Sequence, residues 1–210
     1  MVGQMNTGAG RSVGRSRAPL IAVALALAAI AVGWLLFGRG RPVEAGPLAG
    51  SGIGGPFALI DQDGHARTDR DFAGHYRLIY FGYTFCPDVC PTDLARNARA
   101  LGLARSVADK VQPIFITVDP ARDTPAVLKQ YVANFPPRLI GLTGSADAVR
   151  RAAAAYKVYA SKQAVPGASG SLMSHTDITY LMGPDGAPIA FFTGADSAQK
   201  VADDLGRYVR

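Results

Sequence analysis

The chain has 210 residues, 49% of them hydrophobic and 18% charged, with a formal net charge of +6. It is too apolar for a disordered chain and long enough for one domain with a real core. The positive charge gathers at the N-terminus: residues 1–52 hold five Arg and one Glu, whereas residues 53–210 hold 17 bases and 15 acids. A nearly neutral domain lacks the basic stripe of a nucleic-acid binder, so we expect no nucleic-acid partner.

Residues 20–37 form an uncharged apolar run of 18 residues. As a helix this run spans roughly 27 Å, close to the ~30 Å hydrocarbon core of a bilayer. Three arginines and no acid precede it, which favours a cytoplasmic N-terminus. We therefore expect residues 1–19 to be a cytoplasmic tail and residues 20–37 a single transmembrane helix in the inner (cell) membrane, with the remaining chain on the periplasmic side. The alternative is a cleaved signal peptide, but the run exceeds the usual 7–15 residues and no A-x-A site follows directly.

Residues 38–52 are rich in Gly, Pro and Ser, which predicts a flexible linker. From residue 53 to residue 210, apolar strand patterns alternate with helical ones. We expect strands over 57–60, 78–83, 114–118, 139–142, 178–181 and 189–192, and helices over 89–107, 124–135, 145–156 and 196–208. The last two strands flank Gly-Pro-Asp-Gly and form a hairpin. This order predicts an α/β domain with a mixed sheet flanked by helices.

The two cysteines of the chain, Cys86 and Cys90, lie between a buried strand and a helix. Helix N-termini stabilise anions, so we expect a lowered pKa for at least one thiol. The i, i+4 spacing brings both sulfurs to one side, where they close a disulfide or bind one metal ion. A purely structural disulfide is the plain alternative, but so short a loop constrains the unfolded chain little. Thioredoxin-type oxidoreductases have two intervening residues, and this chain has three.

Three segments carry a resemblance to a known family. They are FGYTFCPDVCPTDL (residues 81–94), ITVDPARDTP (residues 116–125) and SHTDITYLMGPDG (residues 174–186). They resemble the SCO/SenC family of copper chaperones, over essentially all of residues 53–210. The resemblance implies a thioredoxin-like fold, a role in assembling the CuA centre of cytochrome c oxidase, and copper ligation by Cys86, Cys90 and His175. It also implies three partners: the copper-bearing oxidase subunit, a copper donor protein and a thiol reductant.

Residue chemistry agrees with that ligand set without singling it out. Two thiolates and one imidazole form a soft site that suits Cu(I), with zinc as the main chemical rival. His175 follows Cys90 by 85 residues, so only the resemblance places it beside the thiols. One departure is Phe85, because relatives often carry His immediately before the first cysteine.

Other candidate residues have plainer interpretations. Asp119, Arg122 and Asp123 follow a strand end, where they orient the metal loop or dock a partner; alternatively, Asp123 and Thr124 cap the next helix. Met173 offers a thioether that copper can bind, but an incidental Met in a loop rich in Gly and Ser is the plainer interpretation. The two remaining histidines, at positions 65 and 75, are expected to be solvated or satisfied locally.

Three functions fit these residues. The first is a copper metallochaperone, which His175 favours because disulfide exchange does not require it. The second is a thiol–disulfide oxidoreductase in which Cys86 and Cys90 reduce the cysteines of a copper acceptor. The third is a thiol peroxidase, which the missing Pro-x-x-x-Thr approach to Cys86 disfavours.

Overall fold

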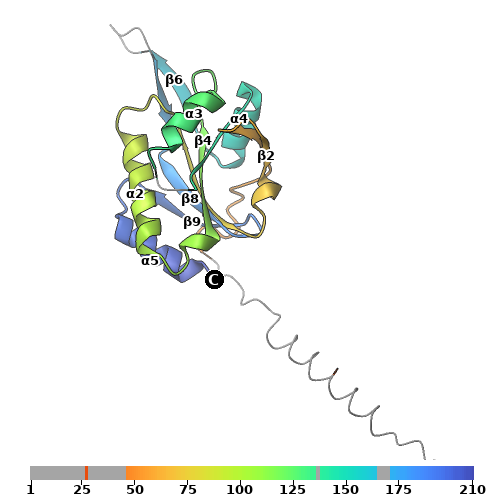
Figure 1. Ribbon diagram of the computed structural model, residues 1–210, viewed down its shortest axis with the longest axis vertical. Helices are drawn as coiled ribbons and strands as arrows, with labels where there is room; N and C mark the ends of the chain where they lie inside the picture. Colours follow the sequence, from red (N-terminus) through yellow and green to blue (C-terminus); the bar gives the residue numbers. More distant parts are fainter. Residues whose placement is uncertain (1–26, 28–45, 136–137, 165–170) are drawn as a thin grey trace, which may run out of the picture. The chain divides into compact units, whose positions relative to one another are not determined.

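The computed structural model describes residue 27 and residues 46–135, 138–164 and 171–210 (Figure 1). Within these ranges, no helix combines the length and the hydropathy needed to cross a membrane. The expected tail over 1–19, the expected span over 20–37 apart from Leu27, and linker residues 38–45 lie outside the described residues.

Seven strands form one mixed sheet in the order β2-β1-β5-β4-β3-β8-β9. Their bounds are β1 Ala58–Asp61, β2 Ala66–Thr68, β3 Tyr76–Gly82, β4 Val111–Thr117, β5 Ile140–Thr143, β8 Ile178–Met182 and β9 Pro188–Thr193. The three central strands β3, β4 and β5 run parallel, and β8 pairs with β3 in the antiparallel sense. Strands buried on both faces read as unbroken apolar runs, which is why β3 and β4 stand out in the sequence.

Four helices surround this sheet: α2 Val89–Leu103, α3 Pro125–Val132, α4 Ala146–Ala155 and α5 Ala198–Tyr208. Two single turns of 3-10 helix, η1 Asp69–Phe72 and η2 Ala108–Lys110, complete the helical elements of the described chain. The hydroxyls of Thr124, Ser145 and Ser197 cap α3, α4 and α5 by accepting a hydrogen bond from a backbone N–H three residues later.

The helices lie on both faces of the sheet. Successive side chains of a strand point to opposite faces. Tyr80 stacks on Phe115, which contacts Tyr131 of α3, whereas Phe81 contacts Tyr156 at the end of α4. Therefore α3 and α4 cover opposite faces. Helices α2 and α5 pack together, away from α4, as Figure 1 shows.

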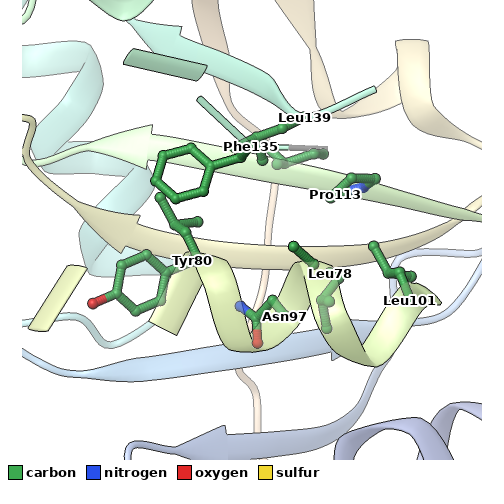
Figure 2. Close-up of a pocket in the computed structure, with 10 residues that line it drawn as sticks. Leu78, Tyr80, Asn97, Leu101, Pro113, Phe135 and Leu139 are labelled. Atoms are coloured by element: carbon green, nitrogen blue, oxygen red, sulfur yellow. The ribbon is translucent and has the colours of Figure 1, made fainter. Parts of the chain in front are cut away.

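A narrow, mostly apolar pocket lies between α2 and the central strands (Figure 2). Its lining comprises Leu78, Tyr80, Leu94, Asn97, Ala98, Leu101, Pro113, Ile114, Phe135 and Leu139. The Asn97 amide is satisfied, because its Nδ2 donates to Thr179 Oγ1 at 2.9 Å. The pocket thus continues the apolar core and presents no unpaired amide.

The expected mixed sheet with flanking helices is confirmed, and every expected strand and helix is present with shifted ends. The sequence reading missed β2 and a separate two-stranded hairpin, β6 Ala160–Ala164 with β7 Ser171–His175. Both lack a long apolar run: β2 is three residues long, and β6 and β7 are mostly polar or small. His175 is therefore the last residue of a strand, not part of an irregular loop.

The segment before residue 53 bonds to the domain. Leu48 N donates to Ile189 O at 3.1 Å, and Lys157 Nζ donates to Ser51 O at 2.7 Å. Leu48 and Ile53 also pack against the main core. Within the described residues, contacts with the domain therefore include Leu48 and Ser51, ahead of the boundary expected from composition.

Candidate metal centre

The sheet topology brings three distant segments to the same end of the central strands. Strands β3 and β4 are parallel, so the segments after Gly82 and after Thr117 both leave the sheet at the C-terminal ends of these strands. Strand β8 is antiparallel to β3, with Thr179 opposite Tyr80, so β8 begins where β3 ends. His175 lies three residues before β8. The loop that carries Cys86, the segment of residues 118–125 and His175 therefore meet at this end of the sheet.

Cys86, Cys90 and His175 form one cluster, in which the ligand atoms all lie within 4.8 Å of one another. Cys90 Sγ lies 3.3 Å from His175 Nε2, and Cys90 N donates to Cys86 Sγ at 3.4 Å. Cys90, the second residue of α2, is fully buried, whereas Cys86 in the preceding loop is partly exposed. Both thiols are free. The structure thus brings together the three residues that the resemblance implied.

The His175 ring is oriented with a free nitrogen toward the thiols. Its Nδ1 lies 3.0 Å from the Thr176 carbonyl oxygen, which only accepts hydrogen bonds. Nδ1 therefore carries the proton, and Nε2 directs its lone pair toward Cys90 Sγ. The rings of Tyr80 and Tyr83 meet the imidazole edge-on at 6.2 and 5.8 Å and fix its plane. A metal-binding histidine needs this tautomer and this fixed orientation.

Burial raises the pKa of the Cys90 thiol, and the neighbouring Cys86 sulfur adds to that rise. The expectation of a thiolate stabilised by the helix N-terminus is therefore wrong for Cys90. Burial in an apolar core outweighs the helix field, because a buried anion loses its hydration. A soft metal cation between the sulfurs would supply the missing positive charge and displace the proton.

Asp123, from the second motif, holds the cysteine loop. Its fully buried carboxylate accepts hydrogen bonds from Thr84 N at 3.0 Å, Thr84 Oγ1 at 2.6 Å and Thr117 Oγ1 at 2.6 Å. Thr84 lies two residues before Cys86. The predicted orientation of the loop by Asp123 agrees with these hydrogen bonds, and Thr124 caps α3 without it. Docking of a partner stays a prediction.

Arg122 and Phe85 form the rim of the same loop. The Arg122 guanidinium lies over the Tyr83 ring at 5.8 Å and the Phe85 ring at 5.1 Å, and it pairs with Asp119. Phe85 is 67% exposed although it is a large aromatic residue. Position 85 thus offers an exposed aromatic ring and no imidazole.

The sequence reading missed a buried polar network behind the cluster. Arg96 pairs with Asp93 at 2.8 Å and donates to Thr179 Oγ1 at 3.1 Å, which links α2 to β8. Burial, together with the adjacent Asp177 carboxyl, raises the pKa of Asp93 to about 7, while Arg96 acts in the opposite direction. The available signal was the helical spacing of Asp93, Arg96 and Asn97, which places three polar residues on the core face of α2.

The remaining candidates lie as follows. His65 and His75 are exposed and do not belong to the cluster, as expected for solvated residues. Met173 is partly buried, and with Cys86 and His175 it lines an open hollow. The other residues of this hollow are Tyr83, Pro87, Asp88, Val89, Ser174 and Asp177. The hollow gives the cluster an opening to solvent on the Cys86 side.

Comparison with known proteins identifies the family. The family model SCO1/SenC matches residues 46–210. Protein SenC of Rhodobacter capsulatus is 42% identical over 161 residues, which cover 77% of this chain and 72% of that protein. Several relatives are named mitochondrial SCO1 or SCO2 homologues, and the matched region spans between 51% and 76% of their length.

Two solved structures share the fold. ScoI of Bradyrhizobium japonicum with copper bound is 44% identical, with a TM-score of 0.68, and the match covers 75% of this chain and 99% of that one. BsSco is 25% identical, with a TM-score of 0.55, covering 73% and 91%. It is described as having a disulfide switch and as a member of the Sco family of cytochrome c oxidase assembly proteins. The fold is therefore thioredoxin-like, as the sequence resemblance implied.

Proposed function

This chain belongs to the SCO1/SenC family, and from that premise we propose that it is a copper metallochaperone that helps assemble the CuA centre of cytochrome c oxidase. Copper is its cargo, held by Cys86, Cys90 and His175. The observation that carries the proposal is the arrangement of two thiols and an imidazole lone pair within 4.8 Å. Copper bound to the related ScoI supports it.

The three ligands differ in their exposure to solvent, and this difference predicts the order in which they release copper to an acceptor protein. Two thiolates and one imidazole suit Cu(I), and each thiol releases its proton as the ion binds. Cys90 is fully buried, whereas Cys86 and His175 both border the open hollow. An incoming thiolate of the oxidase subunit therefore displaces the two accessible ligands first, and the buried Cys90 releases the ion last.

The second candidate function is reduction of the acceptor's disulfide, favoured by the two free thiols and the disulfide switch of BsSco. The more exposed Cys86, as thiolate, attacks the acceptor disulfide and forms a mixed disulfide. Cys90 then attacks Cys86, which leaves a Cys86–Cys90 disulfide and two reduced acceptor thiols. A thiol reductant restores the pair, and a separate donor protein supplies copper.

The N-terminal assignments complete the proposal. Residues 1–19 form a cytoplasmic tail and residues 20–37 a single transmembrane helix. Residues 38–52 connect it to the copper-binding domain, and the later part of this connection, including Leu48 and Ser51, bonds to that domain. The apolar run and its arginine flank support this arrangement. It places the domain on the periplasmic side of the inner membrane, where an oxidase copper subunit is accessible.

Copper stoichiometry of the reduced full-length protein tests the metal assignment. We expect one copper per chain, with thiolate-to-copper charge-transfer bands for Cu(II). His175→Ala should weaken Cu(II) binding more than Cu(I) binding, because two thiolates alone retain the softer ion. His75→Ala is the matched control, since His75 is exposed and away from the cluster. Equal copper binding by wild type and the double Cys→Ser variant would contradict the assignment.

A second experiment separates the two candidate functions. His175→Ala should leave reduction of a model acceptor disulfide within a few-fold of wild type, because attack depends on the thiols. The same variant should lose copper delivery, read as cytochrome c oxidase activity of a deletion strain at limiting copper. Full oxidase activity with His175→Ala would favour the reductase.

A further inference from the structure

Arg77 is a buried cation at the opposite end of β3 from the metal centre. It is the second residue of the strand, about 16 Å along the strand from Gly82. Its side chain is almost fully buried: the residue is 4% exposed. Nη2 donates to Gly183 O at 3.0 Å, while Nε is buried without a hydrogen-bond partner. Among the described residues, Arg77 forms no ion pair within 4.0 Å.

A pocket open to solvent lies directly beside this guanidinium. Arg77, Arg70 and Tyr156 line it, together with the turn at residues 184–186. Gly186 in that turn has φ +86°, and a Cβ there would lie 3.1 Å from Arg77 Nη2. The bare backbone of the glycine therefore leaves room beside the guanidinium that a side chain would fill.

The two acidic residues that line the pocket accept hydrogen bonds from backbone N–H groups and not from Arg77. Asp69 Oδ1 accepts a hydrogen bond from Phe57 N at 3.3 Å, and Asp185 Oδ1 accepts one from Ala187 N at 2.9 Å. Asp69 thus ties η1 to the segment at Phe57, and Asp185 holds its own turn. Neither carboxylate lies within 4.0 Å of the Arg77 guanidinium. A buried charge without a counter-charge is strongly unfavourable, so the site favours an anion from outside the chain.

We propose that this pocket, the Arg77 pocket, binds a small oxyanion, either a phosphate or a carboxylate. The planar guanidinium presents two N–H groups that match two oxygens of such an anion. Arg70 at the exposed rim adds a second positive charge. The site lies apart from the copper cluster, so anion binding does not depend on the copper function.

The test is a titration of the purified, reduced full-length protein with inorganic phosphate, followed by ³¹P NMR. Wild type should bind with a millimolar dissociation constant, and Arg77→Met should weaken binding at least tenfold. Arg105→Met is the matched control, because Arg105 is exposed and lies outside the pocket. Equal phosphate binding by wild type and Arg77→Met, or none by wild type, would overturn the proposal.

Two further arms cover the other outcomes. If Arg77→Met does not fold, Arg70→Met replaces it and should weaken phosphate binding several-fold; unchanged binding would count against the pocket. Acetate and glycerol phosphate, a fragment of a lipid headgroup, identify the source of the anion. Preference for either one supports an oxyanion site and names its class. If Arg77 merely braces the Gly183 turn, none of the three anions will raise the melting temperature above chloride at equal ionic strength.

Discussion

Replacing Asp123 with alanine should disturb the metal centre although Asp123 is not a ligand. The carboxylate is fully buried and accepts three hydrogen bonds, two from Thr84 and one from Thr117. The two hydroxyls can turn to other acceptors, but the Thr84 N–H cannot. A buried donor left without an acceptor destabilises the fold by about 1–3 kcal/mol, and the loss of a hydrogen bond to a charged group by about 1.5–3 kcal/mol. We expect Asp123→Ala to lower the free energy of unfolding by about 3–5 kcal/mol.

Asparagine should rescue most of this loss. Thr84 N and Thr117 Oγ1 both donate to Oδ2, which the amide oxygen replaces. The amide nitrogen then takes the place of Oδ1 and donates to Thr84 Oγ1, whose hydrogen turns away. Only the charge is lost, which costs about 1 kcal/mol. Thr124→Ala is the matched control, because it removes the α3 cap, also for about 1 kcal/mol, without touching Thr84.

Urea unfolding and the Cu(II) charge-transfer bands of the folded variants provide the measurements. Asp123→Ala should shift or weaken the bands, because Thr84 no longer fixes the loop before Cys86. Asp123→Asn and Thr124→Ala should retain the wild-type bands. Wild-type bands in folded Asp123→Ala would refute the positioning role, whatever its stability.

Three further predictions concern other parts of the chain. The native state keeps the Asp93 proton up to about pH 7 whereas the unfolded chain releases it near pH 3.8, so this group's contribution to stability is present below pH 4 and is lost as the pH rises to 7. The free energy of unfolding of wild type relative to Asp93→Asn, measured with urea, should therefore fall from pH 4 to pH 7. A difference that stays constant over this range would contradict the reasoning. Gly82→Ala places a Cβ 3.0 Å from Cys90 Sγ and should cost about 1–3 kcal/mol and weaken copper binding, whereas Gly102→Ala, which meets nothing within 4 Å, should be neutral or stabilising. Alkaline carbonate should leave the full-length protein in the membrane pellet, and a soluble form that begins after Phe37 would argue for a cleaved signal peptide.

Local patterns in the sequence predicted most of the fold. The buried strands were recognisable as apolar runs, and Thr124 followed by Pro125 marked the start of α3. The hairpin β6–β7 was not predictable, because its residues are mostly polar or small and form no long apolar run. Strand order was equally hidden, since the antiparallel pairing of β8 with β3 depends on contacts about 100 residues apart.

The candidate site was predictable only through the resemblance. Residue chemistry proposed a soft metal site at Cys86 and Cys90, but nothing local placed His175 beside them. The raised pKa of Cys90 was missed for a related reason: helix position is visible in sequence, whereas the burial that overrides it depends on the tertiary packing of α2.

The 85 residues between Cys90 and His175 have a consequence for the order of events after synthesis. An unfolded chain keeps the α-carbons of the two cysteines within about 14 Å of each other, because only three residues separate them. Bringing the imidazole to them requires closing a long loop, an entropic cost that only the finished sheet offsets. We therefore expect a newly synthesised chain to capture Cu(I) by its cysteines at once, but to acquire the third ligand only when β8 has docked. A spectrum with an imidazole ligand thus reports completed folding, and copper held by sulfur alone marks an immature carrier.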